Sequence, residues 1–369
     1  MASFEFEASL RMQLREAAER EQRRSLVARF AAAARVLLPN VGHSVLPAAA
    51  VAATVAAAIS VAAIFLMSES AQRPVAPPEV VAEFKPAASL GATFAAFGSV
   101  WTADTSRDEL LRVEPDSRRV VGRLPVAGEL ALGAGAGALW ALQEGSPGGG
   151  FGLYGPLLRI DPSTNRVTAR IALSTPDGQP FEGYEILTGQ DEVWVAGVSW
   201  ALRVDPRSNR VTQAIAAPDQ LVSTHFALLD GALWAISEDG RLMRFDTSTG
   251  RVLSDARLGL AEASDLSNGP GGALIAAAPG ALARVEPYTG RVLWRTRVGR
   301  PLQAWSPAGG LIWARSSGQV HDRLTALDPD TGAILTRVEL EDFGGTAIAT
   351  VDDELWLSTI GGNMVVLRR

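Results

Sequence analysis

The segment Leu158-Arg159-Ile160-Asp161-Pro162-Ser163-Thr164-Asn165-Arg166-Val167 is the most regular copy of a phrase that recurs along the chain. Further copies of its turn begin at Val113, Val204, Phe245, Val285 and Leu327. A second half of the phrase, seen in Gly137-Ala138-Leu139-Trp140, recurs at Trp101, Trp140, Trp194, Trp234, Ile275, Trp313 and Trp356. The resulting period of roughly 40 residues is typical of a four-stranded propeller blade.

The carboxylate of the recurring turn has a structural interpretation. In Asp161-Pro162-Ser163-Thr164-Asn165 the proline fixes φ, the carboxylate accepts local N–H groups, and the asparagine tolerates a positive φ. A metal-binding interpretation is disfavoured because six copies of the turn carry Asp or Glu at the same place. The recurrent tryptophan likewise indicates packing between sheets rather than a ligand cage.

The repeat predicts an all-β fold, a seven-bladed β-propeller over residues 79–369. In the third unit we expect Glu185–Leu187 to be the innermost strand and Arg210–Ile215 the outermost. The last unit ends at residues 364–369 with no outer strand after it. Val80–Phe84 matches the pattern of an outer strand, so this N-terminal strand is predicted to complete the last blade and to close the ring.

Two copies of the phrase, residues 158–167 and 202–211, resemble the repeats of bacterial YncE-like and virginiamycin B lyase-like propellers. The resemblance covers about residues 79–369, and the proteins it points to include extracytoplasmic binding and sensor modules as well as a lyase. One unit, residues 283–294, is also similar to the tryptophan-docking repeat of quinoprotein dehydrogenases. Only this unit keeps that tryptophan position and the chain has no cysteine, so no quinone or other cofactor is predicted.

The N-terminal quarter is predicted to contain a membrane anchor. Val45–Met67 is an uncharged run long enough to cross a bilayer as a helix, which predicts a transmembrane helix at residues 44–67. A buried core helix or a cleaved signal peptide is the alternative. Residues 1–43 are predicted to be a cytoplasmic helical segment. This helix is either solvated or bound to the membrane surface, or it binds a partner or a second copy of itself. Arginines concentrated before the span place the propeller outside the cell membrane, and residues 68–78 form a Pro-rich linker.

Composition excludes some functions. The chain has a net charge of −6 and no run of Lys and Arg, so nucleic acid is not an expected partner. The absence of cysteine excludes disulfides, thiolate metal sites and a cysteine nucleophile.

Two insertions interrupt the repeat and indicate where a site lies. The stretches 143–154 and 175–184 lengthen loops that emerge on one face of a propeller. We expect their aromatic residues to form a raised patch for an unknown protein, glycan or small-molecule ligand; the candidates are Phe151, Tyr154, Phe181, Tyr184 and Trp200. The alternative is that the two loops only pack on each other.

Catalysis would need a general base, and the propeller region holds only His225 and His321. Nearby carboxylates that could join them are Glu182, Glu262, Asp265, Glu341 and Asp342. No metal site is predicted. We expect a non-catalytic binding, sensor or interaction module. The alternatives are a metal-assisted lyase or hydrolase using these histidines, and a structural subunit of an envelope complex.

Overall fold

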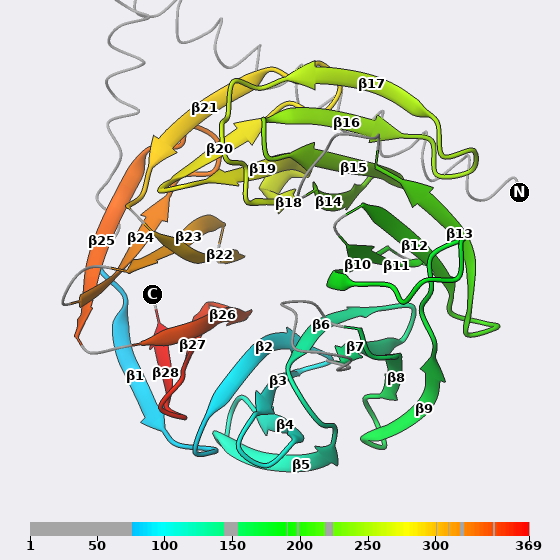
Figure 1. Ribbon diagram of the computed structural model, residues 1–369. Coiled ribbons are helices and arrows are strands. Elements are labelled where there is room, and N and C mark those ends of the chain that lie inside the picture. The colour runs from blue at the N-terminus through cyan, green and yellow to red at the C-terminus, as the bar shows by residue number, and fades with distance from the viewer. Residues whose placement is uncertain are drawn as a thin grey trace, which may run out of the picture. The chain divides into compact units, whose positions relative to one another are not determined.

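The computed structural model describes residues 76–143, 154–189, 191–197, 199–217, 224–299, 301–308, 310–317, 321–341 and 344–368. All of them belong to one compact unit, Gln72–Arg369. They form seven four-stranded antiparallel sheets, which Figure 1 shows arranged around a common axis. The predicted propeller is therefore confirmed.

In blades 1 to 6 the four strands follow the chain outward from the axis. Blades 1 to 3 consist of β2 (Leu90–Ala96), β3 (Ser99–Asp104), β4 (Glu109–Glu114), β5 (Arg119–Pro125); β6 (Leu130–Gly135), β7 (Ala138–Gln143), β8 (Leu157–Asp161), β9 (Arg166–Ile171); and β10 (Gly183–Thr188), β11 (Val193–Gly197), β12 (Trp200–Asp205), β13 (Arg210–Ala216).

Blades 4 to 6 consist of β14 (Thr224–Leu229), β15 (Ala232–Ser237), β16 (Arg241–Phe245), β17 (Val252–Arg257); β18 (Asp265–Gly269), the 3-10 turn η1 (Pro270–Gly272), β19 (Ala273–Ala278), β20 (Ala281–Val285), β21 (Val292–Arg297); and β22 (Leu302–Ala308), β23 (Leu311–Ser317), β24 (His321–Leu327), β25 (Ile334–Glu341). Blade 7 consists of β26 (Gly345–Val351), β27 (Glu354–Thr359), β28 (Met364–Arg368) and β1 (Glu79–Phe84).

The ring closes as the sequence predicts. Strand β1 pairs antiparallel with β28, from Glu79 opposite Arg368 to Phe84 opposite Met364. The outer strand of the last blade thus comes from the N-terminal end of the propeller, as Figure 1 shows where the blue strand lies beside the red one. Because both ends of the domain share one sheet, opening the ring requires breaking that ladder.

The recurrent tryptophans form the core between blades. All six, Trp101, Trp140, Trp194, Trp234, Trp313 and Trp356, are at most 2% exposed, and Ile275 fills the fifth slot. Each lies on the second strand of its blade and packs with residues of a neighbouring blade: Trp101, for example, joins Leu139 and Leu158 of blade 2. Burial of such large rings stabilises the stacking of sheets, which confirms the structural interpretation.

The Asp-Pro turn is held by hydrogen bonds among its own residues, and it also accepts a hydrogen bond from the preceding blade. The Asp161 carboxylate accepts the N–H of Ser163 at 2.8 Å together with the hydroxyls of Ser163 and Thr164, and these hydrogen bonds lower its pKa to about 2. Asn165 has a φ of 52°. From blade 1, the Arg112 guanidinium donates to the Pro162 carbonyl at 2.6 Å. The recurring acid is therefore part of the scaffold.

The same contact repeats between other blades. Arg159 donates to the Pro206 carbonyl at 2.6 Å, and Arg284 donates to the Pro329 carbonyl at 2.7 Å. Arg112 and Arg159 also lie over the tryptophan of their own blade, 5.4 and 5.7 Å from the ring centres. An arginine on the third strand thus joins its own tryptophan to the next turn.

At the closing interface the arginine comes from the opposite direction. Blade 7 has Val366 opposite Trp356, and Arg118 of the blade 1 turn covers that ring at 4.7 Å. Arg118 also pairs with Glu354 at 2.7 Å, and Arg368 pairs with the same carboxylate at 2.6 Å. Arg118 adopts a φ of 58°, where the other turns use Asn or Gly. This cluster connects blades 1 and 7.

The predictions for the N-terminal segment lie mostly outside the described residues. These are the cytoplasmic helix at 1–43, the transmembrane helix at 44–67 and nearly all of the linker at 68–78. Within the part of the chain that the structure does describe, there is no helix with the length and apolar character needed to span a bilayer.

Candidate functional site

The propeller has two faces that differ in their connections. The tight turns within blades, including the Asp-Pro turns, lie on one face, named here the turn face. The links between blades and those between second and third strands lie on the other, named here the loop face. The link between β9 and β10, which carries the second insertion, joins two blades and so lies on the loop face, and the described ends of the link between β7 and β8 belong to the same face; most of the first insertion lies outside the described residues.

The second insertion folds back onto the blade. Its tip is a small hairpin in which Thr175 N–H bonds to the Gln179 carbonyl at 3.0 Å and Ser174 bridges to Pro180. Phe181 then enters the core, where it is 2% exposed and packs with Trp140 and Leu142. The insertion is therefore anchored by a buried ring.

The predicted aromatic patch needs correction for this reason. Phe181 is buried in the core and is not part of a raised surface, because the apolar contacts with blades 2 and 3 stabilise its ring more than solvent does. Trp200 begins β12 and is partly buried against the same core. Phe151 lies outside the described residues. Tyr154 and Tyr184 remain accessible, Tyr184 with 43% of its surface exposed.

The two tyrosines share one carboxylate. The Tyr184 hydroxyl donates to Glu182, and Tyr154 is close enough for its pKa to be raised, first by its hydrogen bond with Glu182. The pKa of Tyr184 is also raised, by burial and by Glu182. Tyr184 is the extra residue of a β-bulge between Gly183 and Glu185, which leaves its ring exposed. The two insertions thus meet in a polar Tyr-Glu-Tyr group.

Three ionisable side chains lie at one equivalent position of consecutive inner strands, and we name them the axial cluster: Glu185 on β10, His225 on β14 and Asp265 on β18. In each blade, one residue of the inner strand pairs with the recurrent tryptophan of the second strand, or with the isoleucine that replaces it in blade 5. These pairs are Leu187 with Trp194, Ala227 with Trp234, and Ser267 with Ile275, and each ionisable residue stands two positions before the inner-strand member. Three neighbouring blades therefore place them at one depth along the axis.

Burial and the charge of Asp265 shift the pKa values of these groups. Burial raises the pKa of Glu185 well above its ordinary value, and the Asp265 charge adds to the effect. Burial lowers the pKa of His225, which the Asp265 charge partly opposes. Burial raises the pKa of Asp265, although the Trp305 indole and His225 oppose that rise. The cluster therefore favours neutral side chains over charged ones.

A hollow adjoins this cluster at Asp265, the one member of the cluster that lines it, and we name it the axial cavity. It measures about 330 Å³ and is lined by Ser264, Asp265, Ala277, Leu302, Gln303, Ala304, Trp305, Ala347 and Ile348. The Trp305 Nε1–H donates to the Asp265 carboxylate at 2.7 Å, which fixes that side chain at the wall. Ligand sites of this size with a few polar groups are common in proteins.

The two histidines separate. His225 begins an inner strand as expected and joins Asp265, one of the carboxylates predicted to accompany a histidine. His321 is the first residue of β24, a third strand, where it pairs with Glu341 of β25. Among the described residues, no three His, Asp or Glu side chains come close enough to hold a metal ion.

Sequence reasoning did not single out Glu185 as a site residue, although a signal was available. Six units carry the recurrent tryptophan. The residues that stand nine positions before that tryptophan are, in chain order, Ala92, Ala131, Glu185, His225, Ala304 and Ala347. In the fifth unit η1 lengthens the turn, so Asp265 stands ten positions before Ile275. Three consecutive ionisable residues among alanines mark the axial cluster.

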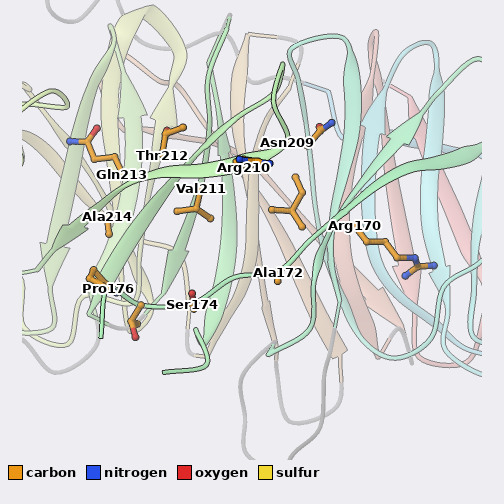
Figure 2. A pocket seen from close by; sticks show the side chains of 12 residues that line it. Arg170, Ala172, Ser174, Pro176, Asn209, Arg210, Val211, Thr212, Gln213 and Ala214 are labelled. Carbon is orange, nitrogen blue, oxygen red and sulfur yellow. The ribbon is translucent and has the colours of Figure 1, made fainter. Parts of the chain in front are cut away.

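A second hollow lies at the rim, away from the axial cluster. It measures about 570 Å³ and lies between the outer strands β9 and β13 and the base of the second insertion. Figure 2 shows Arg170 and Arg210 at this groove with Thr212 and Pro176. Nothing in its lining matches the sequence-predicted site residues.

Comparisons with known proteins agree with this architecture. The family model described as outer membrane protein assembly factor BamB matches residues 238–368. No curated protein matches the chain in sequence. The family match covers about a third of the chain, and it therefore identifies the kind of repeat found in that part.

Solved structures extend the similarity to the whole ring. The β-propeller domain of Cps50 (Swd1) from Myceliophteria thermophila has a TM-score of 0.64 and 11% identity, covering 79% of this chain and 100% of that one. Virginiamycin B lyase from Staphylococcus aureus also has a TM-score of 0.64, with 13% identity and the same coverage. A chain of the Mitotic Checkpoint Complex has a TM-score of 0.62 and 12% identity, covering 81% and 93%.

At these identities the solved structures share the fold with this chain. The predicted resemblance to virginiamycin B lyase-like propellers is confirmed at that level. The protein is thus a seven-bladed β-propeller, with repeats of the kind that the BamB family model describes in its C-terminal part.

Proposed function

We propose that this protein is a non-catalytic interaction module that binds its partner on the loop face, around the axial cavity. The supporting observation is that the interruptions of the repeat and the ionisable residues of the inner strands converge there. The Tyr-Glu-Tyr group and Glu185 are joined through four consecutive residues, 182–185. A rigid scaffold that carries elaborated loops and desolvated polar groups on one face is typical of a binding site.

The cellular setting is part of the proposal. The uncharged run at 45–67 would hold the propeller at the outer side of the cell membrane, with residues 1–43 in the cytoplasm. The match to a family described as an outer membrane protein assembly factor supports a role in an envelope complex, with a protein as the partner.

The test is affinity capture with the full chain from its native membranes. Tyr184→Ser removes a ring that is 43% exposed on the loop face, and Phe97→Asn removes one that is 42% exposed on the turn face. Asn suits the positive φ of 53° at position 97, so this control is not expected to destabilise the fold. We expect loss of partners with Tyr184→Ser and retention with Phe97→Asn.

A chain lacking residues 1–43 provides the second comparison. If every partner is lost with that truncation and none with Tyr184→Ser, recognition belongs to the N-terminal segment and the proposed function is wrong.

A lyase or hydrolase is the second candidate function, because His225 lies beside Asp265. A histidine near a carboxylate that lines a cavity could act there as a general base. Turnover of a substrate that is abolished by His225→Gln would favour this candidate, whereas the interaction module keeps its partner with that variant or loses it without any turnover.

A further inference from the structure

We infer that the axial cluster and axial cavity bind a cationic group, an alkylammonium or a guanidinium, presented from the loop face. The inference rests on the proposed function of that face and names the chemistry that it recognises. The cation is either the side chain of a protein partner or a free amine.

The cluster has acceptors without a counter-ion. Within the described residues, the Glu185 side chain has neither a hydrogen-bond partner nor an ion pair, and the one charge that shifts its pKa is that of Asp265. The Asp265 carboxylate accepts hydrogen bonds from the Trp305 indole and the Ser267 hydroxyl, and no described arginine or lysine pairs with it. The buried arginine of blade 6, Arg315, is already paired with Asp322 at 2.6 Å. Among the described residues, neither carboxyl therefore forms an ion pair with an arginine or lysine.

The space beside the cluster suits a slender cation. Ala131, Ala304 and Ala347 occupy the equivalent position in three of the other blades, so short side chains surround the ionisable ones. Ala304 and Ala347 line the axial cavity together with the ring of Trp305. An indole beside a carboxylate suits an alkylammonium or guanidinium, because the ring attracts the cation and the carboxylate accepts its hydrogen bonds.

The protonation of the cluster gives this inference a distinctive signature. Glu185 and Asp265 have raised pKa values because of burial, so a bound cation that favours their ionised forms must displace protons. Protonated His225 would repel the same cation, and burial lowers its pKa. Each of the three groups on β10, β14 and β18 therefore acts in the same direction. Affinity for a cation should rise with pH.

The experiment uses the full chain in detergent with n-butylammonium as the probe, followed by saturation-transfer NMR of the probe. 1-Butanol is the neutral probe of equal length, and magnesium chloride tests for a metal ion instead. We expect n-butylammonium to bind at pH 7.5 and to bind several-fold more weakly at pH 5. Glu185→Gln and Asp265→Asn, which preserve volume, should each weaken binding by about tenfold.

Glu109→Gln is the matched control, because Glu109 is a carboxylate of β4 that pairs with Arg123 away from the inner strands. It should leave binding unchanged. Equal binding of 1-butanol, an affinity independent of pH, displacement of n-butylammonium by magnesium alone, or unchanged binding by both cluster variants would overturn the inference.

The capture experiment separates this inference from the proposed function. If Tyr184→Ser releases the partner but the cluster variants bind n-butylammonium as the native chain does, the interaction module stands and the cationic site is refuted. If n-butylammonium releases the partner, the cation is a side chain of that partner. If the probe binds and the partner stays, a free amine is the ligand; both results support the site.

Discussion

Glu354→Gln tests the closure of the ring. Its carboxylate is 8% exposed and pairs with Arg118 at 2.7 Å and with Arg368 at 2.6 Å, while the indole N–H of Trp356 donates to it at 3.2 Å. Glutamine keeps one acceptor and the shape but removes the charge. Hydrogen bonds to charged groups contribute about 1.5–3 kcal/mol each. Both arginines keep solvent contact. We therefore expect the free energy of unfolding to fall by about 2 kcal/mol, which is less than the sum of the separate hydrogen bonds.

The measurement is urea unfolding of the full chain followed by tryptophan fluorescence, with an unchanged slope and a lower midpoint. Glu109→Gln is the control, because it removes a comparable ion pair at 2.8 Å whose partners are 25% and 41% exposed. It should cost less than about 1 kcal/mol. Equal effects of the two variants would refute the view that the Glu354 cluster holds blade 7 to blade 1.

The pH dependence gives a second check on the same residue. Burial raises the pKa of Glu354, but hydrogen bonds and charges from Arg118 and Arg368 lower it more, so the pKa in the folded chain lies below its ordinary value of 4.5. The stabilisation is therefore present above pH 4.5 and is lost as the pH falls through the folded pKa. The difference between native chain and Glu354→Gln should shrink below pH 4.5. A constant difference down to pH 3 would contradict the assigned ion pairs.

Three further predictions concern the insertion, the axial cluster and a turn. Phe181→Ala should cost about 3–5 kcal/mol in urea unfolding and expose the amides of residues 172–182 to hydrogen exchange, whereas a surface ring would cost little. Glu185→Gln should stabilise the fold at pH 7.5 but not at pH 4. The pKa of Glu185 is raised in the folded chain, so this residue destabilises the fold once the pH exceeds the pKa that glutamate has in the unfolded chain. Equal effects on the free energy of unfolding at both pH values would contradict this. Gly332→Ala should destabilise by more than about 2 kcal/mol, since its φ is 70° and a Cβ would overlap Trp294, while Gly310→Ala, with a φ of 74° and open space, should cost only about 1 kcal/mol.

The repeat was sufficient to predict the scaffold. Proline, Asp and Asn or Gly in Asp161–Asn165 determine a local turn whose hydrogen bonds involve only neighbouring residues, so its form follows from residue types. The closing strand was also predictable, because the final unit lacks one strand and Val80–Phe84 matches its pattern. Both depend on local chemistry or on counting.

Whether the Phe181 ring is buried or exposed could not be predicted in the same way. An aromatic residue in a polar loop is favourable on a surface that binds a partner and also in a core gap, and the pattern of the loop does not distinguish these. The gap exists because Gly183 and Gly197 leave room beside the ring, which is a property of three segments together. Tyr184 remained outside because a bulge shifts it out of register with Glu185.

The axial cluster shows how a repeat protein can carry a site without a motif. Glu185, His225 and Asp265 lie about 40 residues apart along the chain, yet equivalent positions on successive inner strands bring them to one depth beside the axis. Each is an ordinary residue within its own unit, and only their shared distance from the tryptophan slot reveals the relation. In such a ring, a change from alanine to an ionisable residue in consecutive units has the significance that a contiguous motif has in other folds. The cation inferred for this site thus follows from the place where the repeat departs from itself, since a partly buried carboxyl without an ion-pair partner destabilises the scaffold and is accounted for by what it binds.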